Sequence, residues 1–134
     1  MIDKSRHGQI AALKLLIRPQ QSTAPQFVAH IGLLVAMAMP YGVPRIEEIA
    51  LKIDLSSRTL QRRLKQHDTT YQGVIVRVRA KMARQLLLHD EASIIEIAFL
   101  LGFSESSAFS RAAGNWFGVA PSEMRRIGSE STKP

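Results

Sequence analysis

The sequence predicts an all-α fold in which two similar pairs of helices are joined by one long helix. Apolar residues recur every three or four positions along most of the chain, and no segment alternates with a period of two. A pattern of about fourteen residues occurs twice, starting at Ile49 and at Ile97, and predicts helical pairs over about residues 44–66 and 94–117. Between them an apolar stripe continues for five turns, which predicts a connecting helix over about residues 71–88.

The chain of 134 residues is long enough for one domain, and its first part is expected to lead into that domain. Residues 1–24 combine a short helical stretch with loop-forming residues, and are expected to be a linker or the remnant of a preceding region. A helix is expected from about Pro25 to Met39. Its apolar run of thirteen residues, 27–39, is too short to cross a bilayer, which takes about twenty residues, so no membrane partner is expected.

Composition argues against several classes of protein. The chain has no cysteine, which excludes disulfides and thiolate metal sites and suits a reducing cytoplasm. No secretory signal opens the sequence, so a cytoplasmic location is expected. The four histidines are scattered over different predicted elements, and nothing beside the paired acidic residues supplies a nucleophile. We therefore expect no catalytic residue, no metal and no cofactor, and an enzyme is the least favoured class.

Positive charge is concentrated in the middle third of the chain. The net charge of the whole chain is +7, and residues 52–84, with nine basic and two acidic side chains, carry an equal excess. The segments before and after it carry net charges of +2 and −2. Such a basic region is typical of a surface that binds a polyanion.

The two copies of the repeat have the features of helix-turn-helix units. Each reads an isoleucine–alanine pair, a turn residue, a hydrophobic residue, a serine and then a second helix. The turn residue is Asp54 in the first copy and Gly102 in the second, and both types tolerate a left-handed backbone. The serine that follows, Ser56 or Ser104, is expected to cap the second helix.

The second helix of the first unit gathers polar and basic side chains on one face. At 100° per residue, Arg58, Gln61, Arg62 and Lys65 share this face, and the two leucines of the helix lie opposite. In a major groove, arginine can bridge guanine O6 and N7, and glutamine can bridge adenine N6 and N7. A connecting helix of roughly 27 Å could hold two such helices about 34 Å apart, which is one turn of B-DNA.

The sequence resembles the DNA-binding domain of the AraC/XylS family of bacterial transcription regulators over about residues 25–126. The resemblance depends on LSSRTLQRRLK in the first unit, RAKMARQLL in the connecting helix, and SIIEIAFLLGFSESSAFSR with WFGVAPSEMRR at the end. It implies a seven-helix domain with two helix-turn-helix units that binds double-stranded promoter DNA and usually activates transcription by contacting RNA polymerase. An effector ligand is expected only where a sensing domain precedes this region.

Carried over by position, the resemblance assigns the residues that read bases. In the first unit these are Arg58, Gln61 and Arg62. In the second unit they are Ser106, Ser107, Ser110 and Arg111. The residues expected to contact phosphates are Ser56, Arg63, Lys65, Arg77 and Ser104. Arg79 lies beside the inward stripe of the connecting helix, so we expect it to be a paired, structural arginine.

The second unit departs from the family pattern at AAGN, residues 112–115, where members commonly have an aromatic and then basic residues. Ala113 leaves the core short of side-chain volume, Gly114 weakens the helix, and the basic residues that would contact phosphates are missing. We therefore expect the first unit to supply most of the affinity. An alternative is a protein-interaction module whose second unit docks on RNA polymerase or another partner rather than on DNA. Residues 127–134 are expected to be a disordered tail.

Overall fold

The structure, a computed structural model, describes residues 26–131, and the expected linker over residues 1–24 lies outside the described residues. Over residues 26–131 the fold is all-helical, as predicted, with seven α-helices and a short 3-10 turn. In chain order the elements are α2 (Gln26–Ala38), η2 (Met39–Tyr41), α3 (Ile46–Lys52), α4 (Ser57–Gln66), α5 (Tyr71–His89), α6 (Ile94–Leu100), α7 (Ser106–Phe117) and α8 (Pro121–Ser131).

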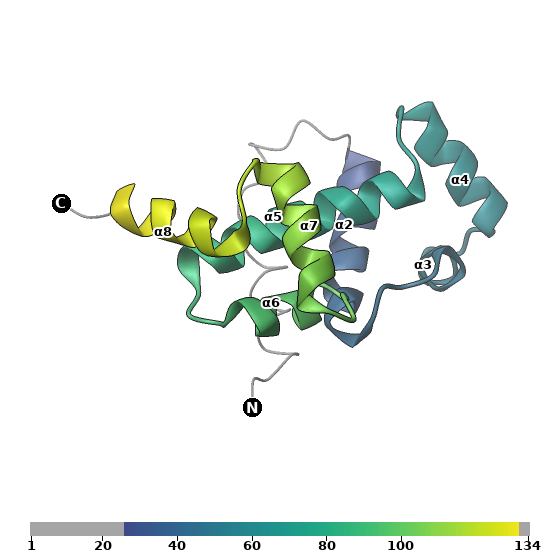
Figure 1. Cartoon of the computed structure of the whole chain (residues 1–134). Coiled ribbons are helices and arrows are strands. Elements are labelled where there is room, and N and C mark those ends of the chain that lie inside the picture. Colours follow the sequence, from purple (N-terminus) through teal and green to yellow (C-terminus); the bar gives the residue numbers. More distant parts are fainter. Residues whose placement is uncertain (1–25, 132–134) are drawn as a thin grey trace.

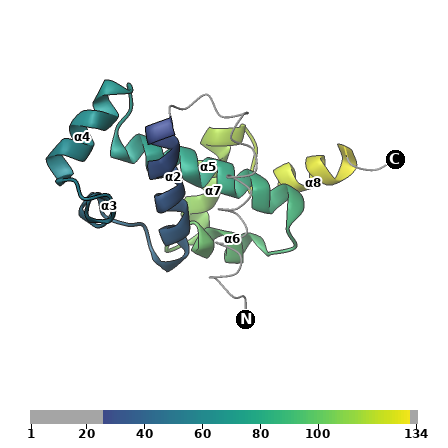
Figure 2. The same ribbon diagram turned by 180° about the vertical axis from the view of Figure 1, so that it is seen from behind.

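The long helix α5 forms the axis of the domain. In Figure 1 it runs through the middle, with α3 and α4 at one end and α8 at the other. The views from the front and from behind place α7 and α2 on opposite sides of α5 (Figures 1 and 2). The predicted inward stripe is buried except for Tyr71, which is half-buried, and Leu87 joins the buried residues. The buried members of the predicted stripe are Val74, Ile75, Val78, Met82, Ala83 and Leu86.

Helix α2 packs along α5, and η2 continues its path to contact α6. Val28, Ile31, Val35 and Ala36 of α2 are buried, as is Met39 at the start of η2. The α2–η2 segment therefore contacts elements of both halves of the domain, which accounts for the nearly continuous apolar surface that its sequence predicts.

The predicted turn residues adopt left-handed backbone conformations. Asp54 has a φ of 57°, and Gly102 has a φ of 81°. The side chain of Ser56 caps α4 as expected, because its Oγ accepts a hydrogen bond from the backbone N–H of Thr59 at 3.1 Å. The prediction that Ser104 caps α7 is wrong. That helix begins one residue later than expected, with Glu105 at the capping position and no side-chain hydrogen bond there.

The tail expected to be disordered from residue 127 is helical as far as Ser131, so the prediction is wrong for residues 127–131. Arg126 forms ion pairs with Glu123 and Glu130, one turn away on either side, which supports the helix. Gly128 lies so close to α5 that an added Cβ would meet Cδ2 of Leu88. Helix α8 is therefore packed against the connecting helix, and residues 132–134 lie outside the described residues.

Candidate nucleic-acid interface

The two helix-turn-helix units form their turns with the same hydrogen bond. In the first unit, the backbone N–H of Leu55 donates to the carbonyl of Ala50 at 3.0 Å. In the second, the N–H of Phe103 donates to the carbonyl of Ala98, also at 3.0 Å. Both alanines are buried, where a larger side chain would separate the two helices of the pair. The repeat in the sequence thus corresponds to a repeated local structure.

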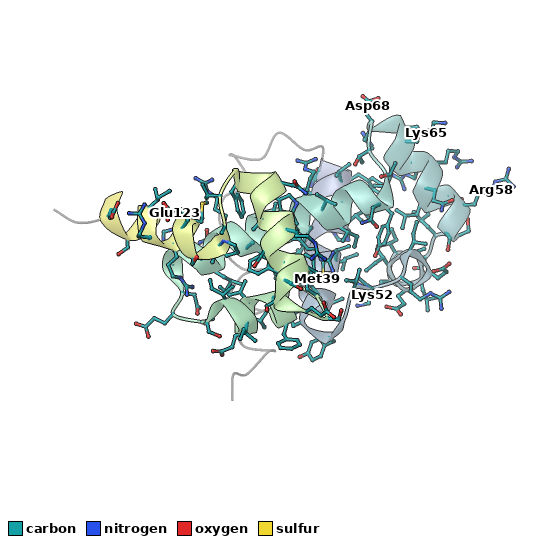
Figure 3. All side chains as sticks on the ribbon, in the orientation of Figure 1. Met39, Lys52, Arg58, Lys65, Asp68 and Glu123 are labelled. Carbon is teal, nitrogen blue, oxygen red and sulfur yellow. The ribbon has the colours of Figure 1, made fainter. Side chains whose placement is uncertain are left out.

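Helix α4 exposes the face that the sequence assigns to base reading. Arg58, Gln61, Arg62 and Lys65 are all exposed, and the two leucines of the helix have no exposed surface. Figure 3 shows Arg58 and Lys65 extending outward from α4 at the edge of the molecule. The buried leucines fix the rotation of α4, and therefore the direction of its polar face.

Two residues expected to contact phosphate beside this face have different surroundings. Ser56 is exposed at the N-terminus of α4, where backbone N–H groups and the helix dipole favour an anion. Arg63 is also exposed, but its guanidinium lies over the ring of Phe27, 4.2 Å from the centroid. Arg63 therefore joins α4 to α2 through a cation–π contact, on a different side of α4 from Arg58.

Helix α7 presents a weaker version of the same face. Ser107 and Arg111 are exposed, whereas Ser106 and Ser110 are half-buried. The Ser107 hydroxyl donates a hydrogen bond to the Glu105 carboxylate at 3.3 Å. Arg111 is thus the one exposed cation among the side chains of this helix, so α7 offers DNA much less positive charge than α4 does.

The departures at Ala113 and Gly114 have different consequences in the structure. Ala113 is fully buried, and an aromatic cluster of Phe103, Phe109 and Trp116 packs beside it with centroids 5.8–6.5 Å apart. These rings supply apolar volume to the core of the second unit. Gly114 is exposed, and an added Cβ there would meet no atom within 4 Å. The glycine is therefore not required by packing.

The connecting helix carries cations on its exposed side. Arg77, expected to contact phosphate, is exposed, and so are Lys81 and Arg84. Burial of part of its side chain lowers the pKa of Lys81, and the positive charge of Arg77 lowers it further. These residues are four and then three positions apart, which places them along one stripe of α5. Helix α5 directly follows the basic helix α4 in the chain.

Each unit is tied to α5 by a side chain of that helix. At the first unit, the Tyr71 hydroxyl donates a hydrogen bond to the Pro44 carbonyl at 2.8 Å. At the second, Arg79 donates from Nε to the Leu101 carbonyl at 2.8 Å and from Nη2 to the Gly102 carbonyl at 3.3 Å. The expectation of a structural role for Arg79 is confirmed. Its partners are backbone carbonyls of the turn, which the sequence pattern did not indicate.

Arg125 is a structural residue that the sequence reasoning missed. From α8, its guanidinium donates to four backbone carbonyls at the end of α5 and in the loop beyond it, at 2.7–3.1 Å. The accepting residues are Leu86, Leu87, Asp90 and Ala92. The carbonyls at a helix C-terminus have no partners within the helix, so an arginine is well suited to bind them. The only feature of the sequence that could have pointed to Arg125 is its place in the Met-Arg-Arg sequence, which belongs to the last family motif.

Residues 26–131 offer no candidate for two other kinds of site. Among residues 26–131, no three or more histidine or acidic side chains gather closely enough to hold a metal ion. In the same part of the chain, no helix has both the length and the apolar character needed to cross a membrane.

Comparison with known proteins identifies the family. A family model described as a helix-turn-helix domain matches residues 49–127, which is more than half of the chain. A solved structure from Chromobacterium violaceum, a transcriptional regulator described as containing an AraC-type DNA-binding domain, superposes with a TM-score of 0.62. It is 29% identical, and the match covers 76% of this chain and 96% of that one. The chain belongs to the AraC/XylS family.

Curated relatives of this AraC/XylS domain are longer proteins. It is 42% identical over 89 residues to the ornithine utilization regulator of Pseudomonas aeruginosa, covering 66% of this chain and 26% of that protein. It is 34% identical over 127 residues to the transcriptional activator RhaS of Escherichia coli O139:H28, covering 91% of this chain and 46% of that protein. The chain therefore spans between a quarter and a half of the length of these two relatives.

Proposed function

We propose that this AraC/XylS domain binds double-stranded promoter DNA in a sequence-specific manner and thereby regulates transcription. Helix α4 enters one major groove, where Arg58, Gln61 and Arg62 contact base edges. Helix α7 enters the next groove, with Arg111 and Ser107 as its main contacts. The half-buried Ser106 and Ser110 contribute less. RNA polymerase is a further partner if the protein activates transcription, and no catalytic step is involved.

The observation that carries this proposal is the exposed face of α4. Four polar side chains, three of them cationic, share a face that makes no contribution to the core, while the leucines opposite it are completely buried. Guanidinium and amide groups are the side chains that bind bidentately to guanine and adenine. A helix in a helix-turn-helix unit with this face is suited to a major groove.

The phosphate contacts follow from exposure and from helix position. We assign them to Ser56, Lys65 and Arg77, and we retain Ser104 because it is exposed just before α7. Arg63 is assigned to the contact with Phe27 instead. Because α5 has 19 residues, it is roughly 28 Å long, which suits two recognition helices placed about one DNA turn apart. The cytoplasm, where bacterial promoters lie, is the corresponding location.

The proposal is tested by selecting bound sequences from random duplexes and then measuring affinity for the selected site. Selection should yield two half-sites separated by about 10–10.5 base pairs. The Arg58/Arg62 double alanine variant should lose most of its preference for the selected site over random duplex. Equal affinity of wild type and this variant for the selected duplex would contradict the proposed mechanism.

A matched control is available in Arg126→Ala. Arg126 is exposed like Arg62, with 54% of its side chain accessible, but it lies on α8 and pairs with glutamates of that helix. Its replacement removes the same charge from the chain without touching either recognition helix. We expect Arg126→Ala to preserve the sequence preference that Arg62→Ala relaxes.

A further inference from the structure

We propose that Arg79 is a positioning residue that sets the direction of α7 relative to α4, and therefore the half-site spacing that the chain accepts. This inference rests on the proposed two-groove binding. Arg79 is the ninth of the 19 residues of α5, so it lies near the middle of the helix that joins the two units. Its side chain contacts the second unit at the turn between α6 and α7.

The contact fixes the backbone of that turn in two ways. The guanidinium donates to the carbonyls of Leu101 and Gly102, which are consecutive residues at the end of α6. Its Cζ atom also lies over the ring of Phe103, 4.1 Å from the centroid. Three successive residues of the turn are therefore held by one side chain of α5. A guanidinium group can make both kinds of contact, because its N–H donors lie along the edge of a planar group whose face can stack on a ring.

The contact continues from the turn to the recognition helix. The ring of Phe103 lies 5.8 Å from that of Phe109 and 6.2 Å from that of Trp116, centroid to centroid. Both of these residues belong to α7, and Phe109 is completely buried. Displacement of the Phe103 ring would therefore move the rings on which α7 is seated, because interiors are close-packed.

The other side of the same turn faces the segment that leads into the first unit. A Cβ added at Gly102 would lie 2.8 Å from Cγ2 of Val43, 3.4 Å from Sδ of Met39 and 3.4 Å from Nη2 of Arg79. Met39 and Val43 precede α3, the first helix of the first unit. Arg79 thus holds the turn of the second unit where it meets the segment that leads into the first unit. A change at this point alters how one unit is oriented on the other.

Burial shows that the contact is not a solvated surface pair. Arg79 is half-buried, and burial lowers the pKa of its guanidinium, which nevertheless remains charged at neutral pH. Hydrogen bonds from a charged donor are stronger than those between neutral groups. Lysine at this position would keep the charge, but it could not bind two carbonyls in a plane and cover the Phe103 ring at the same time.

The experiment compares four duplexes: the selected two-half-site DNA, one version with the spacing one base pair longer, one with it one base pair shorter, and a duplex that carries only the half-site of α4. Affinities are measured for wild type and Arg79→Lys at low temperature, after circular dichroism has shown both to be folded. We expect Arg79→Lys to lose about tenfold in affinity for the preferred spacing. Its discrimination among spacings should fall, whereas its affinity for the single half-site should stay within about twofold of wild type.

Arg125→Lys is the matched control. Arg125 is also a half-buried arginine that binds backbone carbonyls, but its partners lie at the end of α5 and in the following loop, within the second half of the domain. We expect this variant to lose stability and to retain the spacing preference of wild type. If Arg79→Lys does not fold, Phe103→Leu replaces it, because this change removes the stacked ring and keeps an apolar side chain at the turn.

The outcomes separate this inference from the proposed function. An unchanged spacing profile in Arg79→Lys, or an equal loss on one and two half-sites, would overturn the positioning role while leaving two-groove binding intact. A loss of spacing discrimination in Arg125→Lys as large as in Arg79→Lys would also overturn it. Failure of wild type to prefer two half-sites over one would instead refute the two-groove part of the proposed function.

Discussion

Four arginines among residues 26–131 fall into two groups that their surroundings distinguish. Arg58 and Arg62 are exposed on α4, whereas Arg79 and Arg125 are half-buried and donate to backbone carbonyls. In such a half-buried arginine, the N–H donors are already used in hydrogen bonds to backbone carbonyls. An exposed arginine on a recognition helix has its donors directed to solvent, where a base edge or phosphate can replace water. Exposure therefore decides which arginines can read DNA.

A direct test at this scale compares the corresponding arginines of the two units. Arg62→Ala should weaken binding to the selected site by about 1–3 kcal/mol and relax the preference at one base pair. Arg111→Ala should have a smaller effect, because α7 carries fewer polar groups that can cooperate with it. Fluorescence anisotropy on labelled duplexes measures both values. A larger loss for Arg111→Ala would show that the second unit supplies the greater share of affinity.

Tyr71 gives a prediction about pH. Burial, followed by the negative charges of Glu48 and Glu47, raises the pKa of the Tyr71 phenol from 10.0 to about 12. Because the pKa is higher in the folded protein than in the unfolded chain, the protonated phenol stabilises the fold. This contribution is fully present below about pH 10 and is lost as the pH rises towards about 12.

Tyr71→Phe should therefore lower the free energy of unfolding at neutral pH by about 1 kcal/mol, a value that allows for solvent around the half-buried ring. The difference between wild type and variant should close as the pH rises above 10. Urea unfolding at a series of pH values measures it. Tyr41→Phe is the control, because Tyr41 is 72% exposed. A pH-independent difference between wild type and Tyr71→Phe would contradict the assignment.

At the scale of the element, α7 combines a well-packed inner side with a low intrinsic helix stability near its C-terminus. Phe109 and Ala113 are fully buried and Trp116 packs beside them, so the inner side is fixed. Gly114, in the last turns, has no packing requirement and lowers the intrinsic stability of the helix. Gly118 ends the helix with a φ of 79° and donates its N–H to the Gly114 carbonyl at 2.9 Å.

These two glycines form a matched pair for a stability test. An added Cβ would meet no atom within 4 Å at either position, so only the backbone conformation differs. Gly114→Ala should raise the free energy of unfolding by about 1 kcal/mol, because alanine favours the helix. Gly118→Ala should lower it by about 1 kcal/mol, because a Cβ is strained in the left-handed region. Thermal or urea unfolding measures both, and effects of equal sign would contradict the explanation.

At the scale of the whole molecule, the charge is unevenly distributed among the helices. The basic side chains of residues 52–84 lie on the end of α3 and on α4 and α5, whereas most acidic side chains of the last third lie around α6 and on α8. DNA should therefore approach the α4 end first and with the strongest attraction. The net charge of +7 makes a steep dependence on salt the expected behaviour.

Salt dependence provides the test at this scale. The logarithm of the binding constant should fall linearly with the logarithm of salt concentration, and Lys65→Ala should reduce the slope by about 1 because one phosphate contact is lost. Arg126→Ala, on α8, should leave the slope unchanged. Titrations with the selected duplex at several salt concentrations measure it. An equal change in slope for both variants would show that overall charge, and not a contact by Lys65, is responsible.

Local sequence patterns were enough to predict the helices, the two repeated turns and the exposed face of α4. These features depend on neighbouring residues, through apolar spacing, capping and the left-handed conformation at Asp54 and Gly102, so local patterns suffice to predict them. The errors also came from local reasoning. Ser104 looks like a cap by analogy with Ser56, and residues 127–131 look polar and unstructured when their packing against α5 is not known.

Contacts between distant parts of the folded chain determine which cations remain available for DNA and how the two units are held together. Arg63 differs from Lys65 because Phe27, on another helix, lies beneath it. Arg79 and Arg125 bind carbonyls 22–39 residues away along the chain, and a carbonyl group is present in every residue, so no side-chain pattern marks the partner. Long-range contacts to the backbone appear only when the chain has folded.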